Sequence, residues 1–144
     1  MASLHVAIYE SGKDAVPHWS LYTMDDSGNE MIYEALGPTG GPYKYNTRHT
    51  TVEREEDISE SPRVGRIEAD VWPSIAKLLN GLPMGGTGTR GWNCQSWVME
   101  AISALRGEGY LEEDEEGIDR VQLMYQRKWK DYEACAKEDE SSSR

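Results

Sequence analysis

The sequence predicts an α+β fold, with an antiparallel sheet of about four to five strands covered by three helices on one side. Through residues 3–69, short segments alternate between apolar and polar positions, which is the period of a strand. From residue 70 onward, apolar residues recur every three or four positions, which is the period of a helix. Strands first and helices last are typical of α+β domains. The 144 residues suffice for one such domain, which we place at residues 1–137, with a disordered tail at 138–144.

The predicted strands are short segments rich in β-branched and aromatic residues, and turn sequences rich in Gly, Pro or Asp separate them. They are residues 3–9, 18–24, 30–36, 43–53 and 63–69. The last of these also fits an extended arm. The segment "DDSGN" predicts a hairpin turn, and the charged segment "REEDISESP" predicts a loop.

The first predicted helix covers residues 70–82. Asp70 is expected as its N-cap, Pro73 lies in its first turn and Gly81 marks its end. Residues 106–117, which hold an acidic run at Glu112–Glu116, predict a loop with a solvated surface.

Two longer helices are predicted from their apolar stripes, one from about Cys94 to Leu105 and one over about 118–137. The first stripe is Trp97, Val98, Ala101, Ile102 and Leu105. The second stripe is Ile118, Val121, Tyr125, Trp129 and Tyr132. We expect Trp97, Ile102 and Trp129 to be core residues.

Charge and composition exclude several classes of function. The net charge of −11 repels phosphate backbones, so we expect no nucleic-acid partner, and it disfavours anionic membranes. No apolar run approaches the roughly 18 residues that a membrane span needs. The N-terminus has no signal-peptide pattern, so we expect a cytoplasmic protein with reduced cysteines. A Cys94–Cys135 disulfide is the less favoured alternative. We expect no cofactor and no metal site.

Cys94 is the residue that most directly suggests chemistry. It follows Asn93, a good N-cap residue, and starts a helix behind a loop rich in glycine at residues 85–91. The partial positive charge of a helix N-terminus favours the thiolate, which is the nucleophilic form of cysteine. The alternative is a small hydrophobic core residue, because Cys94 lies on the apolar stripe. The loop is either a flexible lip over a site or a plain connector.

A nucleophilic cysteine needs a base, and the chain offers three histidines. His5 and His49 fit solvated or packed strand positions. His18 directly follows Pro17 and starts a strand, at a sheet end from which a side chain can reach a helix N-terminus. A histidine at a strand start and a cysteine at a helix start have the layout of a Cys–His pair.

The segments "HWSLY" and "NCQSWV" resemble motifs of the circularly permuted branch of the NlpC/P60 papain-like superfamily. In that branch the histidine strand precedes the cysteine helix. The group includes lecithin:retinol acyltransferase-like proteins and PPPDE-type peptidases, and small uncharacterised fungal proteins with HW and NCQ-W motifs are closer still. The resemblance covers about a dozen residues and implies a permuted papain-like fold.

The resemblance assigns Cys94 as the nucleophile and His18 as its base. The third polar residue of the family falls on the strand 30–36, which holds no histidine, so Glu34 or Tyr33 takes its place. Alternation places these two on opposite faces, and the more apolar face favours Tyr33 on the helix side, which we take as the side of Cys94 and His18. We choose Glu34 because a carboxylate stabilises an imidazolium where a phenol does not, and because a strand end next to a glycine-rich turn often redirects its side chains.

The oxyanion donor is expected to be the backbone N–H of Cys94. The other candidate contacts to the oxyanion or the substrate are Asn93, Gln95, Trp19 and Trp92.

The expected function is therefore a cysteine-dependent hydrolase or acyltransferase that acts through a thioester on an amide, isopeptide or ester bond. The strong negative charge, and the lack of the anchoring helix of many acyltransferase relatives, favour a peptide-like substrate over a lipid. One alternative is a papain-like fold that binds a protein and has lost its chemistry, which the missing second histidine favours. Another is a structural protein in which Cys94 is core. The sequence indicates no oligomeric state.

Overall fold

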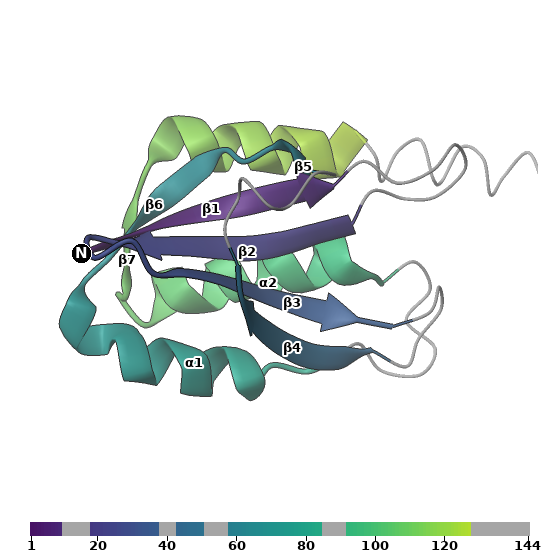
Figure 1. Ribbon diagram of the computed structural model, residues 1–144. Coiled ribbons are helices and arrows are strands. Elements are labelled where there is room, and N and C mark those ends of the chain that lie inside the picture. The colour runs from purple at the N-terminus through teal and green to yellow at the C-terminus, as the bar shows by residue number, and fades with distance from the viewer. Residues whose placement is uncertain (10–17, 38–42, 51–57, 85–91, 128–144) are drawn as a thin grey trace, which may run out of the picture.

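The computed structural model describes residues 1–9, 18–37, 43–50, 58–84 and 92–127. Within them, seven strands form one antiparallel sheet that helices cover (Figure 1). The strands are β1 (Ala2–Tyr9), β2 (His18–Asp25), β3 (Glu30–Leu36), β4 (Lys44–His49), β5 (Ile58–Glu60), β6 (Arg63–Ile67) and β7 (Leu111–Glu113). The helical elements are η2 (Ala69–Val71), α1 (Trp72–Asn80), α2 (Cys94–Gly107) and residues 115–127. The α+β class is confirmed, whereas the expected number of strands was too low.

The strand order across the sheet is β4-β3-β2-β1-β6-β7, and β5 also pairs with β1. β5 and β6 run along the same edge of β1, opposite to β2. Pro62 separates them, and its carbonyl accepts a hydrogen bond from the N–H of Val6 at 3.0 Å. Because proline has no N–H to donate to the ladder, it interrupts the strand at this point.

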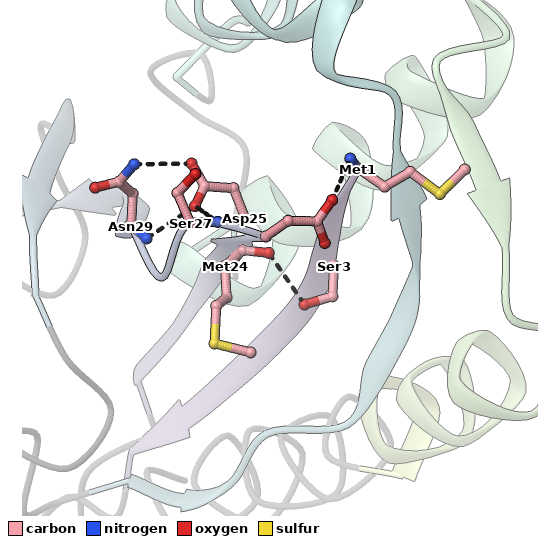
Figure 2. Close-up of polar contacts among 7 residues, drawn as sticks. Met1, Ser3, Met24, Asp25, Ser27 and Asn29 are labelled. Atoms are coloured by element: carbon pink, nitrogen blue, oxygen red, sulfur yellow. Dashed lines mark hydrogen bonds and ion pairs between the residues drawn. The ribbon is translucent and has the colours of Figure 1, made fainter.

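The hairpin turn between β2 and β3 forms where the sequence predicts it (Figure 2). Asp25 Oδ1 accepts hydrogen bonds from the backbone N–H groups of Ser27 at 2.9 Å and Asn29 at 2.8 Å. Gly28 adopts a φ of 84°, a left-handed conformation that glycine reaches without a steric penalty. At the same end of the sheet, the N-terminal amine of Met1 pairs with Asp26 at 2.9 Å. The turn contacts of Asp25 and the conformation of Gly28 fit the register of β2 and β3, in which Met24 lies opposite Glu30.

The core lies between the helices and one face of the sheet. Its members come from β1, β2, β3, β6, α1, α2, β7 and the helix over residues 115–127. The largest fully buried side chains are Trp19, Trp97, Leu4, Leu21, Ile32, Ile67, Ile75, Leu79, Leu105, Val6, Val64 and Val98. All of these except Ile32 belong to the helix-facing core. The opposite face carries a smaller cluster of Ala7, Tyr22 and Ile32, with Tyr9 and Ile58 against it.

The first two helices follow their apolar stripes. Every residue of the predicted α2 stripe is buried, as expected for Trp97 and Ile102 in particular. α1 ends at Gly81 as predicted, but Asp70 is not its N-cap. Asp70 lies in the 3-10 turn η2, and the N-cap position is Val71, without a side-chain hydrogen bond. Pro73 in the first turn carries no N–H, which reduces the number of donors that a cap would have to satisfy.

Two segments that were predicted to be loops contain the short strands β5 and β7. Each has three residues, and each exists through its pairing with β1 or β6. The last helix begins at residue 115, before the predicted 118, and the carbonyl of Asp114 accepts the N–H of Ile118 at 3.0 Å. Ile118 and Val121 are buried there, as the stripe predicts.

Several sequence predictions lie outside the described residues. They concern residues 51–53 of the fourth predicted strand, the loop 85–91, and residues 128–144 with Trp129, Tyr132 and Cys135. Among the described residues, no helix has the length and the apolar character that a membrane crossing requires.

Candidate active site

The elements β2, β3 and α2 bring the candidate residues together at one end of the sheet. β2 begins, β3 ends and β4 begins at the end where α2 has its N-terminus (Figure 1). α2 packs against β2 and β3. His18 is the first residue of β2, Cys94 is the first residue of α2, and Glu34 lies near the end of β3. Residues 76 positions apart in the sequence thus share one site.

The N-terminus of α2 is fixed by a capping box. Asn93 Oδ1 accepts hydrogen bonds from the N–H groups of Gln95 at 2.9 Å and Ser96 at 3.3 Å, and Ser96 Oγ accepts the N–H of Asn93 at 3.2 Å. The prediction that Asn93 caps this helix is confirmed. Cys94 therefore stands in the first turn, where the helix end carries a partial positive charge. Its side chain is mostly buried, with a relative exposure of 9%.

His18 contacts Cys94, Glu34 and Tyr9. Its Nε2 lies 2.8 Å from Glu34 Oε1, and its ring centroid lies 5.3 Å from that of Tyr9. Burial disfavours the imidazolium, but the hydrogen bonds with Cys94 and Glu34, together with their negative charges, outweigh this cost and raise the pKa of His18 to about 9. His18 is therefore protonated at neutral pH in this environment.

Glu34 is a buried carboxylate with polar partners on both oxygens. Oε1 faces His18, and Oε2 accepts hydrogen bonds from Asn46 Nδ2 at 3.1 Å and Arg48 Nε at 3.2 Å. Burial alone would raise the pKa of Glu34, but the hydrogen bonds from His18, Asn46 and Arg48 lower it below its usual range. The carboxylate therefore stays ionised and can stabilise the imidazolium.

The choice between Glu34 and Tyr33 follows from which face of the sheet His18 occupies. His18 and Tyr22 share one face of β2, and Tyr22 lies opposite Ile32, which shares the face of Glu34 on β3. Tyr33 points to the helix-facing core and contacts the edge of Trp72, with ring centroids 6.2 Å apart. Alternation placed Tyr33 correctly on the helix side. The assumption that this is also the His18 side was wrong.

The other predicted contact residues have different surroundings. Trp19 is fully buried in the helix-facing core and exposes no surface to a substrate in this structure. Asn93 Oδ1 is used by the helix cap, and Gln95 is buried. Trp92 is half-buried, its Nε1 donates to Glu100 Oε2 at 3.2 Å, and its ring lies 5.2 Å from that of Tyr43.

Asn46 and Arg48 also belong to this cluster, although the sequence did not predict them as site residues. Both lie on β4, two residues apart, and therefore on one face of the strand. Asn46 lies directly opposite Glu34, and Arg48 lies opposite Ile32. The alternation of "KYNTRH" places these two polar side chains on one face, but only the pairing of β3 with β4 shows that this face is shared with Glu34.

The two remaining histidines lie elsewhere. His5 is half-buried on β1, where its Nδ1 lies 3.0 Å from the carbonyl of Ser61, and His49 is exposed at the end of β4. Burial lowers the pKa of His5. In the part of the chain that the structure describes, no group of three or more His, Cys, Asp or Glu side chains is arranged to hold a metal ion.

Residues 4–112 match the family of unknown function DUF6540, and the chain belongs to this family. No curated protein matches the chain, and no solved structure matches it. The matched segment begins in β1 and ends in β7. It therefore contains Cys94, His18 and Glu34, and the helix over residues 115–127 lies beyond it.

Proposed function

We propose that this protein is a cysteine-dependent hydrolase or acyltransferase that acts through a thioester on an amide, isopeptide or ester bond. The observation that carries the proposal is the contact of Cys94, at the N-terminus of α2, with His18, whose Nε2 is held by Glu34 at 2.8 Å. This is the nucleophile, base and orienting group of a cysteine triad.

The electrostatics support a protonated His18 next to the Cys94 sulfur. His18 keeps its proton up to a pH of about 9, and the α2 N-terminus adds a favourable field at the sulfur. Since Nε2 faces Glu34, we assign Nδ1 as the ring nitrogen that contacts the Cys94 sulfur.

In the first step, the Cys94 thiolate attacks the substrate carbonyl carbon and forms a carbon–sulfur bond. The carbonyl oxygen takes up the negative charge, and we assign the N–H of Cys94 as its donor from the helix end, because the Asn93 cap uses those of Gln95 and Ser96. As the tetrahedral intermediate collapses, the bond to the leaving amine or alcohol breaks. The imidazolium of His18 gives its proton to that leaving group.

In the second step, the neutral imidazole takes a proton from water or from another acceptor. The resulting nucleophile attacks the thioester, the carbon–sulfur bond breaks, and the thiolate and the imidazolium are regenerated. Water gives a hydrolase, and another acceptor gives an acyltransferase. We infer a peptide-like substrate, because the chain carries a net charge of −11 and an anionic lipid surface would repel it.

The order of elements supports a permuted papain-like fold. The histidine strand β2 precedes the cysteine helix α2, and the third polar residue follows on β3. Glu34 takes the place that a second histidine has in the acyltransferase group. A carboxylate in this place orients the ring and stabilises its cation.

Alkylation by iodoacetamide tests the proposal in a Cys135→Ser background, in which Cys94 is the single thiol. At pH 6 we expect Cys94 to react at least about tenfold faster in the native protein than in the urea-unfolded chain, because an ordinary thiol is almost fully protonated there. His18→Gln should remove this advantage. Slow alkylation that does not depend on His18 would indicate a core or binding role and overturn the proposal.

A second experiment traps the covalent intermediate. After incubation with p-nitrophenyl acetate and an acid quench, intact-mass analysis should show one acetyl group, and peptide mapping should place it on Cys94. Cys94→Ala should abolish it, and Cys135→Ser should leave it unchanged. Acetylation that persists in Cys94→Ala would show that the reaction occurs elsewhere.

A further inference from the structure

We propose that Arg48 is a positioning residue of this site. It holds Tyr9 on β1 and Glu34 on β3, the two side chains of the sheet that contact the His18 imidazole. The inference rests on the proposed function of Cys94 and His18. Arg48 Nε donates to Glu34 Oε2 at 3.2 Å, and the same guanidinium donates through a terminal nitrogen to Tyr9 Oη at 3.2 Å. Arg48 therefore ties the edge strand β4 to two strands of the sheet.

The two carboxylate oxygens of Glu34 have separate roles in this arrangement. Oε1 is directed to His18, and Oε2 is held from β4 by Arg48 and Asn46. A carboxylate held on one oxygen alone can rotate about its terminal torsion, which is broad. Holding Oε2 fixes the carboxylate plane and so directs Oε1 at Nε2 of His18.

Tyr9 is the second side chain that Arg48 holds. Its ring packs on His18 with centroids 5.3 Å apart, and Tyr9 lies directly opposite His18 in the pairing of β1 with β2. His18 is thus contacted by a packed ring and a carboxylate that share one cationic partner. The side chain of Arg48 is 39% exposed, whereas that of Glu34 is 3% exposed. Arg48 can therefore be replaced at the margin of the site without opening the core.

Arg48 takes part in no chemical step of the proposed mechanism. The groups that face His18 among the described residues are Tyr9 from β1, Glu34 from β3 and Cys94 from α2. Arg48 contacts Tyr9 and Glu34, and each of these two side chains faces the imidazole. Its removal should therefore change how firmly the His18–Glu34 hydrogen bond is held and leave the nucleophile in place.

The test is solvent exchange of the His18 Nε2 proton, observed by NMR in protein labelled with nitrogen-15 histidine. In the wild type, we expect a downfield nitrogen-bound proton that exchanges slowly because it is donated to the buried Glu34. Arg48→Met should make its exchange at least about tenfold faster or broaden it beyond detection. Arg48→Lys, which keeps the charge but has a single donor nitrogen, should restore part of the protection. Arg66→Met, which replaces an exposed arginine on β6, is the matched control and should change nothing.

Each result decides the inference. Backbone spectra and urea midpoints near those of the wild type establish that the variants are folded. A wild-type exchange rate in folded Arg48→Met would overturn the positioning role, and so would the lack of a protected proton in the wild type.

Iodoacetamide alkylation of Cys94 in the same samples separates the two proposals. Rapid alkylation that depends on His18 together with unchanged exchange in Arg48→Met refutes the role of Arg48 alone. Slow alkylation that does not depend on His18 refutes the proposed function, and the positioning inference with it.

Discussion

Nε2 of His18 and Oε1 of Glu34 lie 2.8 Å apart across β2 and β3, on the sheet face opposite to the helix-facing core. The first residue of β2 thus obtains a buried anionic partner from the neighbouring strand. Tyr33, one position before Glu34, belongs to the core on the other face. Two adjacent residues of one strand therefore serve different layers of the molecule.

The protonation of His18 makes a prediction about pH. Iodoacetate is an anion and iodoacetamide is neutral, and both alkylate the thiolate. The rate with iodoacetate divided by the rate with iodoacetamide does not depend on the thiolate fraction of Cys94, because both reagents need the same thiolate. This ratio reports the attraction of the anionic reagent by a neighbouring imidazolium. Since the pKa of His18 is raised to about 9, the ratio should stay high at neutral pH and fall with a midpoint near pH 9.

The control for this measurement is His18→Gln, in which the ratio should be low and should not vary with pH. A midpoint near 6.5, the ordinary value for histidine, would show that neither Cys94 nor Glu34 stabilises the imidazolium. The measurement uses the same reagent pair at each pH in the Cys135→Ser background.

The distinct positions of Glu34 and Tyr33 predict that only one of two conservative substitutions changes the midpoint of the alkylation ratio. Glu34→Gln removes the charge that favours the imidazolium, so the midpoint of the alkylation ratio should fall by about one unit or more. Tyr33→Phe should leave it in place, because that ring lies in the core against Trp72. The reversed pattern would assign the orienting role to Tyr33. No change in either variant would mean that His18 acts without a third residue.

The fold was largely predictable because its main elements have strong local patterns. The segment 30–36 matches β3, and the start of α2 follows from Asn93 and the apolar stripe. β5 and β7 were not predictable in this way. Leu111 is the one buried residue of β7, and three residues carry too little periodicity to distinguish a strand from a loop.

The site was only partly predictable for a related reason. Cys94 and His18 carry local signals, namely a helix start and a strand start. Glu34, Asn46 and Arg48 meet through strand pairing, and the sequence does not state which face of β2 carries the site. Glu34 could be chosen on chemical grounds, whereas Asn46 and Arg48 required the register of β3 with β4.

The packing of α2 on the sheet predicts a stability effect at a residue outside the candidate site. Ile102 is 3% exposed and belongs to the helix-facing core. Ile102→Ala should lower the free energy of unfolding by about 2–5 kcal/mol, because it removes apolar contacts and leaves a cavity. Urea denaturation followed by tryptophan fluorescence measures this loss. Ser103→Ala, at an exposed position of the same helix, is the control and should change stability by less than about 0.5 kcal/mol.

The last prediction concerns the close approach of the helix over residues 115–127 to β6. A Cβ at Gly117 would overlap the carbonyl oxygen of Arg63 and lie 2.7 Å from its carbonyl carbon, and both atoms are backbone atoms that cannot rotate away. Gly117→Ala should therefore force the helix away from β6 and cost ~3 kcal/mol or more, at the upper end of the effect of overpacking. Gly107→Ala is the matched control, because a Cβ there meets nothing within 4 Å and alanine favours a helix by up to about 1 kcal/mol. Thermal unfolding should thus show a lowered midpoint for Gly117→Ala and an equal or higher one for Gly107→Ala. Equal midpoints for the two variants would mean that the helix does not approach Arg63 this closely.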